Sequence, residues 1–454
     1  MGKIETDHTG SGGGITLSSD GTSLLLDGTA IGGGGGGADL YAAETTGSTD
    51  PTATGTLSLA IGSNAQADGN DSIAIGLDAV AGLDGISIGK SAGNGTLSGG
   101  NYNLAIGRGA ASNLTTGDSN TAVGRSALAA GLTGPLTGSQ NTAIGLDAGA
   151  KVSSGSNNFM GGAQAGNAIT SGSQNTFIGY NSDGVANSSN QTALGYQAIS
   201  GGASATALTN SYASGSESFA AAIANNTSSY GATGANSIAI GYQAKASGEY
   251  SVSFGPSNNV SGAYSGAYGR GNTISGGGLY TGYAFGAENT VSSGLAFAFG
   301  SKASAATNKF AFSTSRFSSN GDAQQGKYIL RSDTTDATAE ALTTNNGTAD
   351  TTNQVVLPNN SAYSFHGTIV ARQKTSDGTA SAAWKVEGLI RREGSAGTTV
   401  LVASTVTALS NTPSWGMALT ADTTNGGLAI TATGAAATNI RWVATINTSE
   451  VTYA

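Results

Sequence analysis

The most regular feature of the chain is a tripeptide, made of a small residue, an apolar residue and glycine, that returns throughout its middle part. Successive motif glycines are often 14 residues apart, and longer intervals indicate copies that carry insertions. The glycine stands at Gly62, Gly76, Gly89, Gly107, Gly124, Gly145, Gly161, Gly179, Gly195, Gly241, Gly255, Gly269, Gly286 and Gly300. Such a period predicts a repeat architecture, with degenerate copies between 201 and 235.

The clearest copies, residues 72–79 and 237–248, contain an alternating apolar segment and a turn; in 237–248 a second short segment and a glycine-containing turn follow. Two short strands in about 14 residues predict one coil of a parallel β-solenoid, whose coils pair about 4.8 Å apart. Alternation places Ile73 and Ile75 on one face and Ala74 on the other. One face can pack against the coil's own second strand, so the other needs a partner, most simply two further copies around a threefold axis. A monomeric solenoid with a mildly apolar outer face is the alternative.

Aromatic residues gather in the late coils. Phe254, Phe285 and Phe299 replace isoleucine directly before the motif glycine, and we interpret them mostly as core filling. Tyr264 and Tyr280 lie between motifs, where a surface position is expected.

The flanks of the repeats differ from them in pattern. Residues 1–31 contain two Asp-Gly turn signals between apolar segments, which predict a hairpin or meander, and residues 32–56 form a glycine-rich linker. Residues 313–454 contain longer alternating runs, which predict about eight strands of an antiparallel β-sandwich or jelly roll. These runs are 327–331, 354–357, 363–372, 382–391, 398–407, 416–421, 428–433 and 439–446.

Composition narrows the function classes. The 454 residues include 73 glycines, no cysteine and two histidines, and the net charge is −9. The lack of cysteine excludes disulfides and thiolate chemistry, and two histidines are too few for a zinc site within one chain. The sequence shows no basic run of the kind that binds nucleic acid. His366 is expected on the surface. We expect no metal, no cofactor and no catalytic residue.

Two features imitate catalytic or phosphate sites. Residues 321–328 resemble a phosphate-binding loop, but Tyr328 stands where a Ser or Thr must bind magnesium, so we interpret the segment as a domain linker. Aspartates, namely Asp68, Asp71, Asp78, Asp84 and Asp147, stand near coil turns, where Asp is favoured for backbone reasons. Stacked in neighbouring coils they could also form the carboxylate pair of a polysaccharide depolymerase, which stays open as an alternative.

The run Ser-x-Ala-Ile-Gly-x-x-Ala-x-Ala-x-Gly, found at 237–248, resembles the YadA-like head repeat of trimeric adhesins, and the resemblance covers roughly residues 57–312. It implies a left-handed parallel β-roll, a homotrimer and an adhesive role. Trimeric autotransporters also carry a signal peptide, a heptad stalk and a membrane anchor, and the sequence pattern shows none of these. The chain is therefore interpreted as similar to tailed-phage fibre proteins.

This interpretation predicts an extracellular virion protein with no enzymatic activity. The N-terminal element would bind a virion tail protein, such as an adaptor, nozzle or baseplate protein. The C-terminal β-sandwich would bind a host surface glycan or outer-membrane receptor, with avidity from three copies. A capsid-surface fibre or decoration trimer, a depolymerase tailspike and a bacterial trimeric adhesin fragment are the alternatives.

Three residues are candidates for receptor contact. The strand pattern places Trp384 and Trp442 in the core, whereas Trp415 follows a turn at 411–414 and is a candidate contact on a loop. Arg391 and Arg392, at the next hairpin, could donate hydrogen bonds to an acidic glycan. The structural alternative is that Trp415 closes the end of the sandwich.

Overall fold

The computed structural model describes residues 49–95, 100–130, 134–221, 230–276, 281–374, 380–410 and 415–453, together with the backbone of three short strands near the N-terminus. The chain divides into two compact units, Met1–Ala222 and Ile223–Ala454. The three N-terminal strands form an antiparallel meander, as the two Asp-Gly signals predict. They are β1 (Leu17–Ser19), β2 (Leu24–Leu26) and β3 (Thr29–Ala30). The polyglycine run at 32–37 lies outside the described residues.

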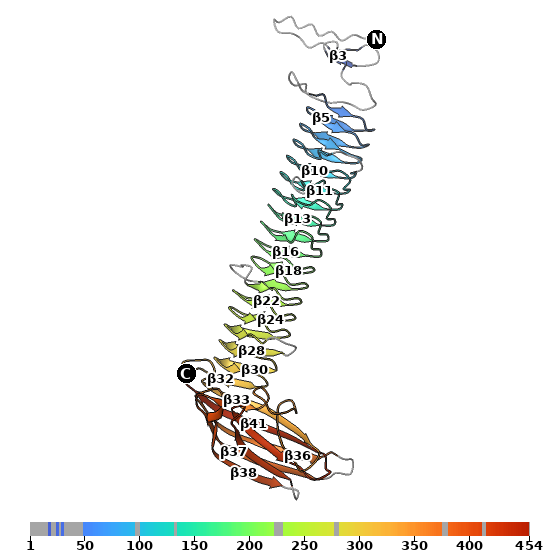
Figure 1. Ribbon diagram of the computed structural model, residues 1–454. Coiled ribbons are helices and arrows are strands. Elements are labelled where there is room, and N and C mark those ends of the chain that lie inside the picture. Colours follow the sequence, from blue (N-terminus) through green and yellow to red (C-terminus); the bar gives the residue numbers. More distant parts are fainter. Residues whose placement is uncertain are drawn as a thin grey trace. The chain divides into compact units, whose positions relative to one another are not determined.

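The first unit is a stack of parallel coils, each contributing one three-residue strand to a common sheet (Figure 1). Neighbouring strands pair without slippage, so that Ala105 lies beside Ala122 and Ala122 beside Ala143. The strands are β5 (Leu59–Ile61), β7 (Ile73–Ile75), β9 (Ile86–Ile88), β10 (Leu104–Ile106), β11 (Thr121–Val123), β12 (Thr142–Ile144), β13 (Phe159–Gly161), β14 (Thr176–Ile178), β16 (Thr192–Leu194), β18 (Thr206–Leu208) and β20 (Phe219–Ala221).

A second, shorter strand per coil occurs in the shorter copies, near both ends of the unit. These strands are β4 (Thr52–Ala53), β6 (Gln66–Ala67) and β8 (Val80–Ala81) at one end, and β15 (Asp183–Gly184), β17 (Ile199–Ser200) and β19 (Tyr212–Ala213) at the other. Between them the longer copies replace this strand with turns. Leu128, Leu136 and Ile169 are fully buried there, so the insertions supply a core that alanine alone would not fill.

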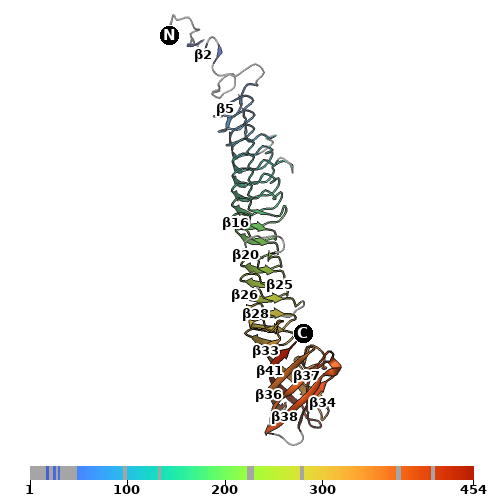
Figure 2. The ribbon, with the colours of Figure 1, turned by 90° about the vertical axis from the view of Figure 1, so that its left-hand side faces the viewer.

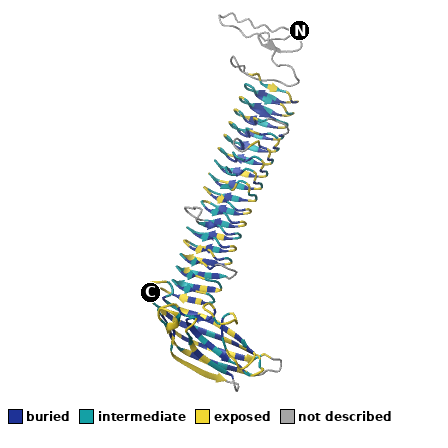
Figure 3. Cartoon of the chain, in the orientation of Figure 1, coloured by how far each residue is buried: buried dark blue, intermediate teal, exposed yellow. Residues whose placement is uncertain are grey.

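The middle residue of each first strand points into the coil, and its two neighbours point outward. Ala74 is fully buried whereas Ile73 and Ile75 are only half-buried, which confirms the predicted division into a small-residue face and an aliphatic face. Figure 3 shows this pattern as alternating buried and intermediate positions along the coils. Alanine suits the inner face because a strand of such a thin coil must approach the opposite wall closely.

Asparagine side chains form a ladder inside the first unit. In the longer coils the residue two positions before the buried one is Asn103, Asn120, Asn141, Asn158 or Asn175, and each is buried. The Nδ2 of Asn141 donates to Gly155 O of the next coil (2.9 Å), and its Oδ1 accepts from Nδ2 of Asn158 (2.9 Å). The ladder therefore links successive coils through side chains as well as through the backbone.

The motif glycines turn the chain at the end of each first strand. Gly145 has φ +137°, and a Cβ there would lie 2.5 Å from the carbonyl oxygen of Gly162 in the next coil, so no other residue fits. This column runs through Gly162 rather than Gly161, which lies in β13 opposite Ile144. The sequence assignment was wrong by one residue in this copy because its two adjacent glycines satisfy the motif equally well.

The second unit begins with coils of the same kind, which keep two strands each. The first strands are β22 (Ile238–Ile240), β24 (Val252–Phe254), β26 (Gly266–Arg270), β28 (Gly282–Ala287), β30 (Ala296–Ser301) and β32 (Phe310–Ser313). The second strands are β21 (Gly231–Ala232), β23 (Lys245–Ala246), β25 (Asn259–Val260), β27 (Thr273–Ile274), β29 (Thr290–Val291) and β31 (Ser304–Ala305). A second asparagine ladder, Asn258, Asn272 and Asn289, runs beside these second strands.

Antiparallel strands follow β32 and form a two-layer sandwich (Figure 2). The larger sheet has the order β33 (Ala323–Thr334), β41 (Ile440–Thr452), β36 (Ser361–Gln373), β37 (Ser381–Arg392) and β38 (Val400–Ser410). The smaller sheet places β40 (Gly427–Thr433) between β39 (Gly416–Asp422) on one side and β34 (Ala339–Ala341) and β35 (Val355–Val356) on the other. The only helical segment in the described ranges is the short 3₁₀ turn Ala396–Thr398.

The structure confirms the predicted all-β fold, a parallel β-solenoid of about 17 turns with antiparallel sheets at its C-terminal side. Two details differ from the sequence expectations. Residues 321–328 are not a linker, because β33 begins at Ala323 and pairs with β32. Strand β34, whose residues are Ala, Glu and Ala, has too little apolar alternation to be predicted.

Candidate functional site

The outward face of the first unit's sheet is half-buried to exposed, and beside its aliphatic residues it carries threonines such as Thr121 and Thr142. Register aligns the outward residues into columns, so that Ile61 lies beside Ile75 and Ile75 beside Ile88. Ile144 is 47 % exposed and Ile178 is 44 % exposed, although both belong to strands whose middle residue is fully buried. A contiguous apolar surface of this kind is typical of a surface that is covered in an assembly.

The corresponding face of the second unit is aromatic. Its rings stack at the spacing of the coils, with centroids 5.0 Å apart between Tyr268 and Phe285 and 4.9 Å apart between Phe285 and Phe299. Phe254 is 52 % exposed and Phe312 is 43 % exposed. The expectation that these phenylalanines fill the core of the coil was therefore wrong. They share the outward parity of the isoleucines they replace, and the buried residue directly before each is Ser253, Ala284 or Ala298.

Trp415 lies in the core of the sandwich rather than on an exposed loop. Its side chain is 5 % exposed and its ring centroid is 5.9 Å from that of Trp442, which stacks in turn on Trp384. The expectation of an exposed contact was wrong because Trp415 comes directly before β39 and packs between the two sheets. This is the alternative in which the indole closes the end of the sandwich.

The two candidate arginines lie on opposite sides of the larger sheet. Arg391 is exposed and forms an ion pair with Glu393 at 3.1 Å. Arg392 is half-buried, and its Nη1 donates to the carbonyl oxygen of Leu357 at 2.7 Å, so it holds a neighbouring loop. The structure thus does not bring Trp415, Arg391 and Arg392 together into one surface.

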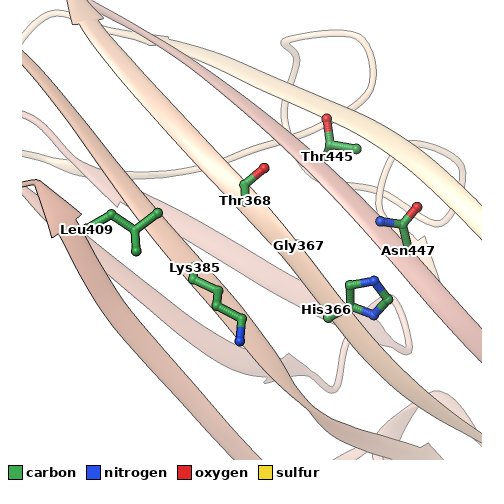
Figure 4. A pocket seen from close by; sticks show the side chains of 7 residues that line it. All are labelled: His366, Gly367, Thr368, Lys385, Leu409, Thr445 and Asn447. Atoms are coloured by element: carbon green, nitrogen blue, oxygen red, sulfur yellow. The ribbon is translucent and has the colours of Figure 1, made fainter.

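A shallow hollow of about 210 Å³ lies on the outside of the larger sheet (Figure 4). His366, Thr368 and Lys385 line it together with Leu409 and residues of β41. His366 is exposed, as predicted. Lys385 forms an ion pair with Glu387 at 3.1 Å, so its charge is already balanced within the chain.

Acidic residues in the coils have backbone roles. Asp71, Asp78 and Asp84 adopt left-handed φ angles of 54°, 56° and 51°, a conformation that Asp tolerates better than most residues.

Burial raises the pKa of Asp183 to about 6, although hydrogen bonds from the N–H groups of Gly184 and Ala168 act to lower it. Within the described ranges no group of three or more His, Cys, Asp or Glu side chains is placed to hold a metal ion.

A buried ion pair joins the last coil to the sandwich. Lys309 Nζ contacts Glu450 Oε2, and both side chains are shielded from solvent. The ammonium also lies 5.9 Å from the ring centroid of Tyr328 and 5.7 Å from that of Tyr363. Burial lowers the pKa of Lys309, and the attraction of Glu450 opposes this shift.

Comparison with known families agrees with this geometry. The YadA head domain repeat matches in two copies, at residues 53–79 and 232–258, one in each unit. No curated protein matches the chain significantly. The chain therefore contains a YadA-like β-roll, the repeat of a family of homotrimeric adhesins. No helix in the described ranges is long and apolar enough to cross a membrane.

Sequence reasoning missed the asparagine ladders and the Lys309–Glu450 pair. The ladder of the first unit had a signal in the sequence, since asparagine stands two residues before the inward position in five consecutive copies. The Lys309–Glu450 pair had none, because residues so distant in sequence meet only through the pairing of β33 with both β32 and β41.

Proposed function

We propose that the protein is the subunit of a homotrimeric adhesive fibre. The observation that carries this proposal is the outward face of the coils, aliphatic in one unit and aromatic in the other. A single chain would leave this surface in contact with water, whereas three copies around an axis would cover it. The homotrimeric state of YadA-family adhesins supports the same arrangement.

Within this class we propose a tail fibre of a bacteriophage, located on the virion and binding the host surface through the C-terminal β-sandwich. Three sandwiches would act together, so that individually weak contacts with a glycan or outer-membrane receptor give firm attachment. The N-terminal element would bind a tail protein. A bacterial trimeric adhesin is the second candidate, and the two YadA head repeats favour it equally.

The proposal assigns no catalytic step to the chain. Asp71, Asp78 and Asp84 adopt the left-handed conformation at coil turns, which accounts for them without a catalytic role.

Immunogold labelling with an antibody against the sandwich distinguishes the two candidates. Gold on the tails of purified phage particles is the expected result, and gold on bacterial surfaces in the absence of phage would favour the bacterial adhesin. Adsorption of the purified protein to cells tests adhesion itself, and release of oligosaccharide from capsular material would instead favour the depolymerase alternative.

A further inference from the structure

The larger sheet of the sandwich has an outer face, defined here as the side directed away from the sandwich core. Its residues alternate with buried ones: Ile329 precedes the fully buried Leu330, and Val370 lies between the buried Ile369 and Ala371. On this face Ile329 is 59 % exposed and Val370 is 53 % exposed. In a two-layer sandwich, the outward positions of a sheet are expected to be polar.

The apolar residues of this outer face form a stripe that crosses all five strands. The register places Val443 of β41 directly beside Val370 of β36, and Val370 beside Ala383 of β37. Ile329 lies diagonally next to Val443 on β33, and Leu409 lies next to Ala383 at the edge. The exposed hollow of Figure 4 adjoins this stripe at Leu409.

The outer face continues the aromatic face of the coils within one sheet. Strand β32 pairs with β33 so that Phe310 lies opposite Lys327 and Phe312 opposite Gln325, and all four are exposed. Residues directly opposite in an antiparallel pair share a face. The side of the sheet that would meet the threefold axis in the coils therefore continues onto the sandwich, with Lys327 and Gln325 between the aromatic residues and the apolar stripe.

The edge of this face favours identical copies over an unrelated partner. Of the charged residues on the face, Lys385 is paired with Glu387 and Arg391 with Glu393, while Arg331 and Arg372 flank the apolar stripe. Strand β38 is an edge strand of 11 residues without a charged side chain, and nearly all of it is exposed. Proteins usually protect such an edge with charges, proline or a cover.

We propose that the outer face of the larger sheet, including β38, is covered by two further copies of the same chain. This inference rests on the homotrimer proposed above and adds that the assembly extends through the C-terminal domain. Receptor contact would then fall on the smaller sheet and the loops, away from Arg391.

Thiol labelling tests this directly because the chain has no cysteine. Val370→Cys places a single thiol at the centre of the outer face, and Leu409→Cys places one at its edge. Thr420→Cys is the control, on the exposed side of β39 in the opposite sheet. Each full-length variant is assayed for mass by light scattering and for its rate of modification by a maleimide-linked polyethylene glycol.

In a trimer, we expect Val370→Cys and Leu409→Cys to react about tenfold or more slowly than Thr420→Cys, and all three to react alike after denaturation. A trimer in which the outer-face thiols react as fast as Thr420→Cys would overturn this inference and leave the proposed trimer intact. A monomeric mass would overturn both.

Discussion

Replacing Asn141 by alanine should destabilise the first unit strongly. The asparagine is fully buried, and its side chain takes part in four hydrogen bonds with neighbouring coils. Alanine removes all four and leaves the carbonyl of Gly155 and the N–H of Asn158 without these partners in a buried position. At about 1 kcal/mol per bond, the expected loss is roughly 3–5 kcal/mol of unfolding free energy.

Urea unfolding followed by far-ultraviolet circular dichroism measures this loss. Asn94→Ala is the matched control, because Asn94 is an exposed asparagine of the same unit. Asn141→Ser should fall between them, since the equivalent Ser72 bonds only within its own coil, from Oγ to the carbonyl of Gly69 at 2.6 Å. If Asn141→Ala shifts the midpoint no more than the control does, the ladder is not a source of stability.

Three further predictions concern separate parts of the molecule. Glu450→Gln should cost roughly 3–5 kcal/mol because Lys309 keeps a buried charge without its partner, and a double Lys309→Met, Glu450→Leu variant should recover most of the loss in thermal melting. In the folded protein the pKa of Asp183 is raised from 3.8 to about 6, so its contribution to the free energy of unfolding is present at pH 4 and is lost as the pH rises to 6. Asp183→Asn should remove this slope from the pH–stability profile. An unchanged slope would contradict the assignment. Trp415→Ala should lower the melting temperature, whereas Arg391→Ala should not; unchanged melting of Trp415→Ala would contradict its core position.

The sequence allowed the repeat and its inward and outward faces to be predicted because both depend on local alternation. Neighbouring side chains of a strand, such as those of Ala74 and Ile75, point to opposite faces of the sheet, so the aliphatic face could be expected from the sequence. The boundaries of β36 and β37 could be predicted for the same reason, whereas β33 and β41 extend well beyond the predicted runs 327–331 and 439–446.

The remaining features depend on contacts that local pattern does not encode. Trp415 follows a segment for which the sequence predicts a turn, and no local pattern directs its side chain inward, yet the opposing sheet covers it with Trp442. The exposure of the late phenylalanines, in contrast, could have been predicted from the repeat, because they share the outward parity of Ile75; their hydrophobicity was wrongly taken to indicate a core position. The outer face of the larger sheet could not be recognised, since its apolar stripe arises from residues of separate strands.

The central claim is that three chains assemble along the outward faces of their coils, and the mass of the full-length protein in solution tests it most directly. Multi-angle light scattering after gel filtration at micromolar concentration should give three times the 44.1 kDa of one chain. A single species of 44.1 kDa under the same conditions would show that the apolar faces stay uncovered, and would contradict the account.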